Sequence, residues 1–368
     1  PSLPWPMMSA LTHNDDRTQV TPMGHGFFFG SAPVGRCTRD SGMPPKTQEW
    51  VKLLSRHTDQ HYYYNIQTGE STWRAPTSKI SRHYNRVARE TTHERKSDKM
   101  LPVRNLHNWL KNCIIRSRCA PGHSVLDLCC GKGGDIFKYK HLGISGYTGV
   151  DFAAAAVQTA RARASSVAFP IELCVKDLRR PLQLRDPSPR DVISAQFCLH
   201  YFWSSEDVAS TFLESAARHL KPGGRLIATF TDEAVLRITA STERRPGSAG
   251  NPLYQLRMGP AREGAAGGFG QCYYFSSGST VRDSEEYMVP LASLCAVAGK
   301  HGLDLLESQN FHQYAYDRMC DEREEQLLEK FRVPPCMTRD EWEVSRNYRV
   351  AVFVKRGSTK RPTPSGGD

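Results

Sequence analysis

A run of residues able to cradle a nucleotide-like ligand lies at 124–135, with the sequence Ser-Val-Leu-Asp-Leu-Cys-Cys-Gly-Lys-Gly-Gly-Asp. Its apolar stretch, Val125 to Leu128, predicts a buried parallel strand, and the glycines that follow predict a tight turn into a helix beginning near Asp135. Glycines let the backbone approach a ligand closely, and the first turn of a helix presents unpaired N–H groups to it. The run therefore predicts a binding site for an adenosine cofactor.

Carboxylates around this turn indicate which cofactor it is. Asp127 lies inside the strand, where it would repel a phosphate-rich dinucleotide and attract the cationic amino-acid end of S-adenosylmethionine. Asp151 ends a second predicted strand, 146–151, about 20 residues after the first glycine, which is the spacing at which an acid reaches ribose hydroxyls. Asp177 closes a third strand-like segment, 171–177, and we expect it beside the adenine. Three such carboxylates favour S-adenosylmethionine over NAD.

Length and composition limit the class of protein. At 368 residues the chain allows one large α/β domain and one small one. The formal charge of +11 suits a polyanionic partner. An odd count of 11 cysteines, with no pair of CxxC motifs, predicts reduced thiols and an intracellular protein without a metal site. No apolar run approaches the roughly 20 residues of a membrane span, so no membrane partner is expected.

Residues 47–78 show a different pattern. Trp50 and Trp73 bracket three short strand-like pieces, and the segment closes with Trp73-x-x-Pro76. This pattern resembles a WW domain, which is a small three-stranded antiparallel sheet. The resemblance implies that Tyr62 and Trp73 form an aromatic groove for a proline-rich segment in the polyproline II conformation.

The first loop of this segment bears on the ligand. Ser55 and Arg56 resemble the loop of those WW domains that bind phosphoserine-proline, in which an arginine and a serine hydroxyl hold the phosphate. A plain proline-rich ligand is the alternative, and the loop does not decide between the two. Residues 1–46, which precede this segment, show no sustained periodicity, and we expect disorder there.

The rest of the chain alternates helices and strands, as in a doubly wound sheet. Residues 79–118 are basic and mostly helical in pattern, and 357–368 predict a disordered tail. The Gly-, Pro- and Arg-rich stretch at 240–268 predicts a loop insertion. The other predicted elements are a helix at 153–164, a strand from 191 running into a loop before 202, a helix at 205–220, strands at 225–230, 271–275, 303–308 and 348–355, and a helix ending at Gly302.

Several motifs within residues 79–356 together resemble the mRNA cap guanine-N7 methyltransferase family. The motifs are His83-Tyr-Asn85, Arg104-Asn-Leu-His-Asn-Trp-Leu-Lys111, the glycine-rich run 125–135, Ser194-Ala-Gln-Phe-Cys-Leu-His-Tyr201, Glu286-Tyr-Met-Val-Pro290 and the segment from Glu341 to Tyr348. The resemblance implies an α/β fold with the Rossmann-like sheet of class I S-adenosylmethionine-dependent methyltransferases. Two residues depart from the family pattern, because Cys129 replaces a glycine and His107 replaces an asparagine.

The resemblance also assigns site residues. It implies that S-adenosylmethionine is held by Lys111, Asp127, Cys129, Gly131, Asp151, Asp177, Gln196 and Tyr201. It implies that the capped RNA end is held by Asn108, Lys132, Arg163, His200, Glu286 and Tyr348. In this assignment Lys132 and Arg163 neutralise triphosphate charge. Glu286 accepts from the N1–H and amino groups of guanine, and His200 donates to its carbonyl.

The implied reaction needs positioning rather than a catalytic acid, base or metal. Guanine N7 has a free lone pair, so no proton must be removed before it attacks the methyl group. The expected partners are the capped 5′ end of mRNA and a proline-rich or phosphoserine-proline peptide, such as the C-terminal tail of RNA polymerase II. A separate capping guanylyltransferase would supply the cap, and the expected location is the nucleus.

Two rival hypotheses stay open from the sequence. The first is an enzyme that methylates the cap-adjacent adenosine at N6, but such enzymes need an Asn/Asp-Pro-Pro-aromatic run, which the sequence lacks. The second is a non-catalytic binding protein in which a degenerate methyltransferase fold presents the WW domain. The departure at Cys129 is the feature that favours it.

Overall fold

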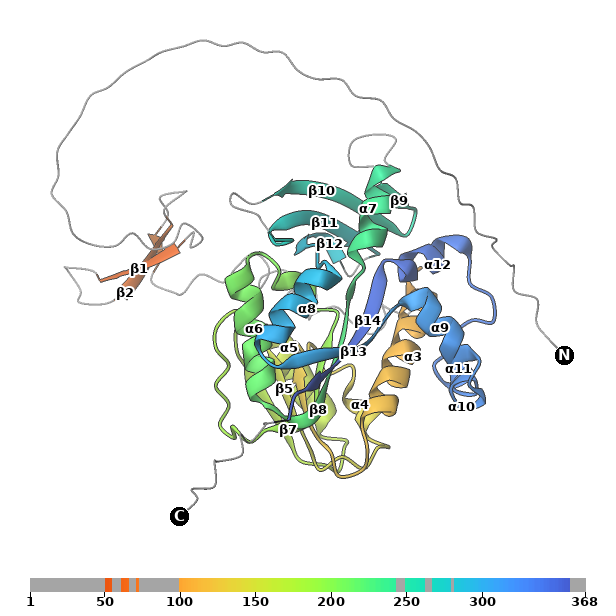
Figure 1. Cartoon of the computed structure of the whole chain (residues 1–368), viewed down its shortest axis with the longest axis horizontal. Helices are drawn as coiled ribbons and strands as arrows, with labels where there is room; N and C mark the ends of the chain where they lie inside the picture. The colour runs from red at the N-terminus through yellow and green to blue at the C-terminus, as the bar shows by residue number, and fades with distance from the viewer. Residues whose placement is uncertain are drawn as a thin grey trace, which may run out of the picture. The chain divides into compact units, whose positions relative to one another are not determined.

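The computed structural model describes the chain in segments, which are residues 50–54, 61–65, 71–72, 99–242, 249–261, 267–278 and 281–357. The chain divides into two compact units, Pro1–Ala75 and Pro76–Asp368. Figure 1 shows the course of the chain and the labels of its elements.

The first unit contains a three-stranded antiparallel sheet. Its strands are β1 (Trp50–Leu54), β2 (His61–Asn65) and β3 (Ser71–Thr72), in the order β1-β2-β3. Leu53 pairs with Tyr62, and Tyr63 pairs with Thr72. The three predicted strands are therefore present, while their assignment to a WW domain stays a prediction.

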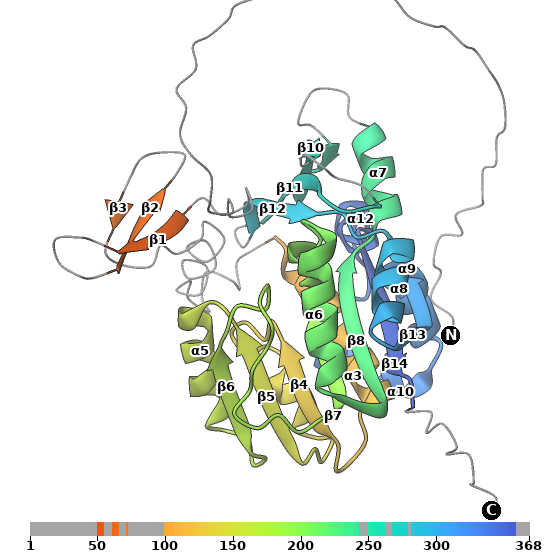
Figure 2. The same cartoon turned by 60° about the vertical axis from the view of Figure 1, so that its left-hand side comes forward.

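The second unit is built on a seven-stranded mixed sheet with the order β13-β14-β8-β7-β4-β5-β6 (Figure 2). Strands β8, β7, β4, β5 and β6 run parallel, and β14 is antiparallel to both of its neighbours. This is the predicted Rossmann-like methyltransferase sheet. The strands are β4 (Ser124–Leu128), β5 (Gly146–Asp151), β6 (Ile171–Val175), β7 (Arg190–Gln196), β8 (Leu220–Thr231), β13 (Leu303–Asn310) and β14 (Tyr348–Lys355).

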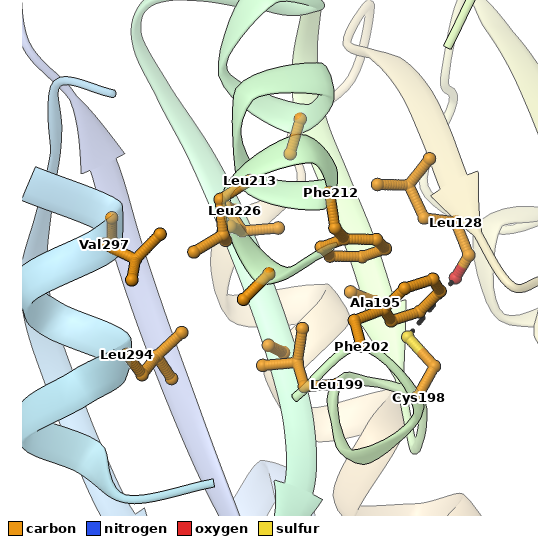
Figure 3. Packing of buried hydrophobic residues seen from close by; sticks show 14 of the residues in the cluster. Leu128, Ala195, Cys198, Leu199, Phe202, Phe212, Leu213, Leu226, Leu294 and Val297 are labelled. Carbon is orange, nitrogen blue, oxygen red and sulfur yellow. Dashed lines mark hydrogen bonds between the residues drawn. The ribbon is translucent and has the colours of Figure 1, made fainter. Parts of the chain in front are cut away.

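Helices cover both faces of this sheet. The helices α6 (Glu206–Arg218) and α8 (Leu291–Lys300) pack on one face, where Phe212 and Leu294 meet Ala195 and Leu226 of the strands (Figure 3). Burying each such side chain stabilises the fold by about 1.5–3 kcal/mol. The other face is covered by α3 (Leu101–Arg118), α4 (Ile136–Tyr139), α5 (Ala154–Ala164) and α9 (Phe311–Met319).

Helix α3 positions part of the site. It has Pro102 in its first turn, where proline is tolerated because the first N–H groups have no helical partner. Leu106, Trp109 and Cys113 recur at helical spacing and are buried against the sheet. The indole nitrogen of Trp109 donates to the carbonyl oxygen of Glu324 at 2.8 Å. These contacts fix the rotation of α3 and hence the direction of its polar side chains.

The predicted loop insertion at 240–268 is wrong for the described residues 249–261, which form two strands. A second sheet has the order β12-β11-β10-β9 and lies apart from the main sheet (Figure 1). Along β10, Tyr254 and Leu256 are buried while Gln255 and Arg257 are exposed. This alternation is short, and Gly- and Pro-rich sequence surrounds it. The strands are β9 (Ala249–Asn251), β10 (Tyr254–Ala261), β11 (Gln271–Ser277) and β12 (Val281–Tyr287).

The strands β11 and β12 therefore belong to this second sheet and do not complete the main one.

Among the described residues, none of the helices combines the length and apolar character needed to cross a membrane. The remaining helices are the 3-10 helix η1 (Leu199–Tyr201), α7 (Glu233–Ser241), α10 (Glu322–Glu325), α11 (Leu327–Lys330) and α12 (Arg339–Arg346).

Candidate active site

A cleft of about 410 Å³ lies at the carboxyl ends of β4, β5 and β7, beside α3. The second sheet contributes to its wall through Phe275, Ser277 and Glu286. In open α/β sheets this edge is where ligands bind. The predicted site residues that line the cleft are Asn108, Lys111, Cys129, Gly131, Asp151, Gln196, His200, Tyr201, Glu286 and Tyr348.

The turn between β4 and α4 depends on left-handed backbone. The φ angle is 62° at Cys129, 53° at Gly131 and 69° at Gly133. A side chain in this region costs roughly 1–2 kcal/mol, so Cys129 carries strain that glycine would avoid. A Cβ atom at Gly133 would lie 2.6 Å from Ile136 Cδ1 and 3.1 Å from Ala160 Cβ. Glycine at 133 is therefore what allows the turn to pack against α5.

Asp151 holds this turn from the end of β5. Its Oδ2 accepts from the Gly131 N–H at 2.9 Å, and its Oδ1 accepts from the Ala153 N–H at 2.8 Å. Burial raises the pKa of Asp151, and the backbone donors oppose that rise. A buried carboxylate with further acceptor capacity in the cleft suits two ribose hydroxyls. The residues present thus fit the sugar of S-adenosylmethionine.

Lys111 extends from α3 into the cleft and pairs with Asp135, a residue to which the sequence assigned no role. The Lys111 Nζ lies 2.8 Å from Asp135 Oδ1, and the Lys138 Nζ lies 2.7 Å from the same oxygen. Burial would raise the pKa of Asp135, but the two ammonium groups outweigh it and hold the pKa well below its usual range. The i,i+3 spacing of Asp135 and Lys138 was the available signal for this network.

Asp127 is not brought into the cleft, which corrects its predicted contact with the cofactor. Side chains of a strand alternate between its faces, and Asp127 shares the face of Val125 rather than that of Leu128. Its Oδ2 accepts from the Tyr147 hydroxyl at 2.6 Å. Burial, followed by the nearby charge of Asp135, raises the pKa of Asp127 to about 7. Asp127 therefore links β4 to the neighbouring strand β5 through its hydrogen bond with Tyr147.

Asp177 lines a smaller hollow of about 40 Å³ beside the cleft. Cys129 and Tyr201 line both spaces, so the two hollows share a wall. The Arg179 guanidinium donates two hydrogen bonds to the Asp177 carboxylate, from Nε to Oδ1 at 3.0 Å and from Nη2 to Oδ2 at 2.7 Å. Burial would raise the pKa of Asp177, but Arg179 outweighs it and the pKa is lowered. The expected position of Asp177 beside the adenine stays a prediction.

Gln196 ends β7 at the edge of the cleft, and both ends of its amide are held. Its Oε1 accepts from the Thr229 hydroxyl at 3.0 Å, and its Nε2 donates to the Ser194 hydroxyl at 3.2 Å. The orientation of the side chain is thereby fixed before any ligand arrives.

Glu286 is buried at the second-sheet side of the cleft, with an exposed fraction of 3%. Its Oε2 accepts from the Tyr273 hydroxyl at 2.7 Å, and its Oε1 accepts from the Tyr201 hydroxyl at 3.4 Å. Burial raises the pKa of Glu286 to about 7, and the two tyrosine hydrogen bonds oppose this rise. Tyr273 is a site residue that the sequence did not reveal, because its role depends on strand pairing opposite Glu286.

His200 lies beside Glu286, with its Nε2 3.8 Å from Glu286 Oε2. Burial lowers the pKa of His200 to about 3, so the ring is neutral at physiological pH and the contact is not an ion pair. The buried Nδ1 of His200 has no hydrogen-bond partner. His200 and Glu286 thus lie side by side in the lining of the cleft.

Tyr348 and His107 belong to an aromatic cluster at the cleft wall. The His107 ring stacks on Phe197 at 5.4 Å, and the Tyr348 ring meets His107 edge-on at 5.1 Å. Burial, and next the charge of Lys111, lowers the pKa of His107 to about 3, so this ring is also neutral. The departure at His107 is accommodated by packing and by a 3.0 Å hydrogen bond to Ser345.

Lys132 and Arg163 are close to each other but do not line the cleft. The Arg163 Nη1 donates to the Lys132 carbonyl oxygen at 3.0 Å, which ties α5 to the turn. Asn108 does line the cleft, and its Oδ1 accepts from Lys138 Nζ at 3.1 Å. Contact of Lys132 and Arg163 with a triphosphate stays a prediction.

The predicted ligand residues of the first unit are mostly beyond the described structure. Ser55, Arg56 and Trp73 lie outside the described residues. Tyr62 lies on β2, opposite Leu53 of β1. The proposed peptide groove is therefore not tested here.

Comparison with known proteins gives a consistent family. Residues 67–356 match the family model for the mRNA (guanine-N(7))-methyltransferase domain. The mRNA cap guanine-N(7) methyltransferase 1 of Oryza sativa subsp. japonica is 30% identical over 312 residues, which cover 78% of this chain and 84% of that protein. The mRNA cap guanine-N(7) methyltransferase of Schizosaccharomyces pombe is 28% identical over 298 residues, covering 76% of this chain and 82% of that protein.

Solved structures are similar to this chain at lower identity. The N-methyltransferase NodS from Bradyrhizobium japonicum, solved with S-adenosyl-L-homocysteine, is 14% identical with a TM-score of 0.44, covering 75% of this chain and 98% of that one. The family match extends over most of the second unit, including every residue that lines the cleft. The chain therefore belongs to the mRNA (guanine-N(7))-methyltransferase family and is an S-adenosylmethionine-dependent methyltransferase.

Proposed function

We propose that this enzyme methylates N7 of the guanosine cap of mRNA, using the cleft between the main sheet and the second sheet. The observation that supports this most directly is the buried pair of Glu286 and His200, which lines the same cleft as Asp151. A carboxylate with room to accept and a ring nitrogen without a partner together match the hydrogen-bonding edge of guanine.

Recognition of guanine requires Glu286 in its ionised form. The carboxylate would then accept from the N1–H and the amino group of the base, while the orphan Nδ1 of His200 would donate to its carbonyl oxygen. Tyr273 and Tyr201 donate to Glu286 and hold it for this task. Adenine presents the opposite pattern of donor and acceptor on this edge, so the site would reject it.

The donor end of the cleft fits S-adenosylmethionine. Lys111 would hold the cofactor carboxylate, Asp151 the ribose, and the hollow beside Asp177 the adenine. When bound, the cofactor supplies a methyl group carried on a sulfonium sulfur, and this sulfur becomes a neutral thioether once the methyl group is transferred. Gln196 and Tyr201 would complete the wall between the donor and the base.

The residues of the cleft act by holding the two reactants in line. N7 carries its own lone pair, so neither Glu286 nor His200 has to move a proton. Fixing the attacking nitrogen and the methyl group at a short distance can supply roughly 7–11 kcal/mol of the barrier. The neutral state of His200 prevents it from repelling the cationic product base.

A direct assay tests this function. The chain is incubated with labelled S-adenosylmethionine and unmethylated capped RNA, and the labelled nucleoside is then identified. The proposal expects 7-methylguanosine as the labelled product. Label in N6-methyladenosine, or cofactor binding by calorimetry without any transfer to the RNA, would contradict it.

A role for the first unit follows from its sequence. We expect it to bind a proline-containing peptide through Tyr62 and Trp73, with Ser55 and Arg56 holding a phosphate, and so to recruit the enzyme in the nucleus to the tail of RNA polymerase II. Titration with phosphorylated and unphosphorylated Ser-Pro peptides tests this expectation. Equal affinities would remove the phosphate from the proposal, and no binding would remove the recruitment.

A further inference from the structure

A second hollow of about 450 Å³ lies next to the proposed active site. It is formed by α3, by the segment from the end of the glycine-rich turn through α4, and by α11 with the turn that follows it. Asn108 lines both this hollow and the cleft that holds Glu286. We call the second hollow the α3–α11 groove. The two hollows therefore adjoin at Asn108.

The ionisable side chains that line the groove are all of basic types, and they are Arg116, Lys138, His141, Lys330 and Arg332. Two of them are already engaged, because Lys138 pairs with Asp135 and Arg116 lies 3.5 Å from Glu324. Lys330 and Arg332 are exposed, and within the described part of the chain neither side chain forms an ion pair. Their charges are therefore available to an anion.

Arg332 is held in an unusual backbone conformation at this place. Its φ angle is 55°, and its carbonyl oxygen accepts from Asn105 Nδ2 of α3 at 2.8 Å. The turn after α11 is thereby fixed against α3. The position of Arg332 at the rim of the groove is set by the fold rather than by a flexible loop.

Asn112 gives an independent sign of a ligand. It lines the groove with an exposed fraction of only 6%, and its Nδ2 has no hydrogen-bond partner. A buried donor without a partner costs about 1–3 kcal/mol. The atom itself is buried, so a phosphate oxygen or a base carbonyl in the groove would satisfy it after rotation of the Asn112 side chain.

Phe137 adds an aromatic surface among these cations. It is 43% exposed on the short helix α4, which is unusual for a phenylalanine, and it lines the groove. Proteins that bind single-stranded nucleic acid combine a cationic path for the backbone with aromatic side chains on which bases stack. The groove has both features, together with a buried amide donor.

From these contacts we infer that the α3–α11 groove binds the single-stranded RNA that follows the cap, with Lys330 and Arg332 on its phosphates and Phe137 against a base. The inference rests on the proposed function, because only a capped RNA leads from the cleft into this groove. The adjacency of the groove and the cleft at Asn108 favours RNA over an acidic protein, because a capped RNA already has its first nucleotide in the neighbouring cleft.

The test compares two substrates for methyl transfer, an unmethylated cap dinucleotide and a capped RNA of 20 nucleotides. The full chain should show a lower KM for the RNA than for the dinucleotide. In the double variant Lys330→Glu/Arg332→Glu, the KM for the RNA should rise about tenfold, and the ratio of the two KM values should approach one. The salt dependence of RNA binding should weaken, with the log–log slope reduced by about 1.4 for two lost phosphate contacts.

The matched control is Arg185→Glu/Arg218→Glu, which changes the same charge at exposed arginines that line neither hollow. It should keep the wild-type ratio of KM values. An unchanged ratio in the Lys330→Glu/Arg332→Glu variant would overturn the inference. Failure of the wild-type chain to methylate either substrate would instead overturn the proposed function.

Discussion

Glu286 carries a buried carboxylate whose hydrogen-bond partners are tyrosine hydroxyls rather than a cation. A carboxylate in this setting ionises near neutrality, and its pKa is raised to about 7 by burial. If guanine binding requires the charged form, the activity should fall as the pH drops through about 7. The proposed chemistry has no proton transfer, so this acidic limb would report recognition of the base.

Replacing Tyr273 by phenylalanine tests this assignment. Tyr273→Phe removes a donor that stabilises the charged form of Glu286, so the pKa of Glu286 should rise further. A hydrogen bond to a charged group contributes about 1.5–3 kcal/mol. Its loss should therefore shift the acidic limb of the kcat/KM profile to higher pH by about one pH unit or more. Tyr274→Phe, on the neighbouring position of β11, is the control. If both variants keep the wild-type profile, Tyr273 does not act through Glu286.

Glu286 should also weaken the fold at high pH. Its pKa is about 7 in the folded chain, against an ordinary value of 4.5 for a glutamate, so the folded state binds the proton more tightly. Stability is therefore lost as the pH rises from about 4.5 through 7, by about 3 kcal/mol in full. Glu286→Gln should abolish most activity yet raise the free energy of unfolding at pH 8, with little gain at pH 4. Urea unfolding at the two pH values measures this, and an equal effect at both would contradict it.

At the scale of elements, the junction of β4 and α4 joins the sheet, α3 and α5. Asp135, at the N-terminal end of α4, receives Lys111 from α3, while Gly133 packs against Ala160 of α5. The turn is therefore a packed structural part as well as a binding surface. Its glycines differ in what surrounds them.

Alanine substitutions at two of these glycines should separate backbone strain from crowding. Both Gly131 and Gly133 have left-handed φ angles, so each change to alanine costs about 1–2 kcal/mol. A Cβ at Gly131 meets nothing within 4 Å, whereas at Gly133 it meets Ile136 and Ala160. Gly133→Ala should thus lower the free energy of unfolding by about 1–3 kcal/mol more than Gly131→Ala. Equal losses in denaturant titrations would contradict the crowded geometry.

Strands and turns of the main sheet were predictable because their signals are local. Apolar runs ending in Asp or Gln, followed by glycine or helix signals, located β4, β5 and β7 closely. The direction of the Asp127 side chain was missed because its face depends on which helices cover the sheet. The α3–α11 groove was out of reach for the same reason, since it joins segments near 112, 137 and 332. The pairing of strands β11 and β12, which no local pattern encodes, also placed Tyr273 opposite Glu286.

At the scale of the whole molecule, the cleft and both sheets belong to one unit, Pro76–Asp368. Every residue that lines the cleft lies within it. A chain beginning at residue 76 should therefore retain methyl transfer to the cap dinucleotide, with kcat/KM comparable to that of the full chain, and should lose binding to Ser-Pro peptides. Loss of dinucleotide activity in a folded, cofactor-binding fragment would show that the first unit takes part in the reaction.

The late position of β14 in the sequence has a consequence for synthesis. This strand lies between β8 and β13 and is translated after every other strand of the sheet. It also brings Tyr348 to the cleft wall. A nascent chain on the ribosome thus exposes an open gap beside β8 until β14 emerges and inserts. Until that insertion the sheet stays open beside β8, and the cleft lacks the wall that Tyr348 provides.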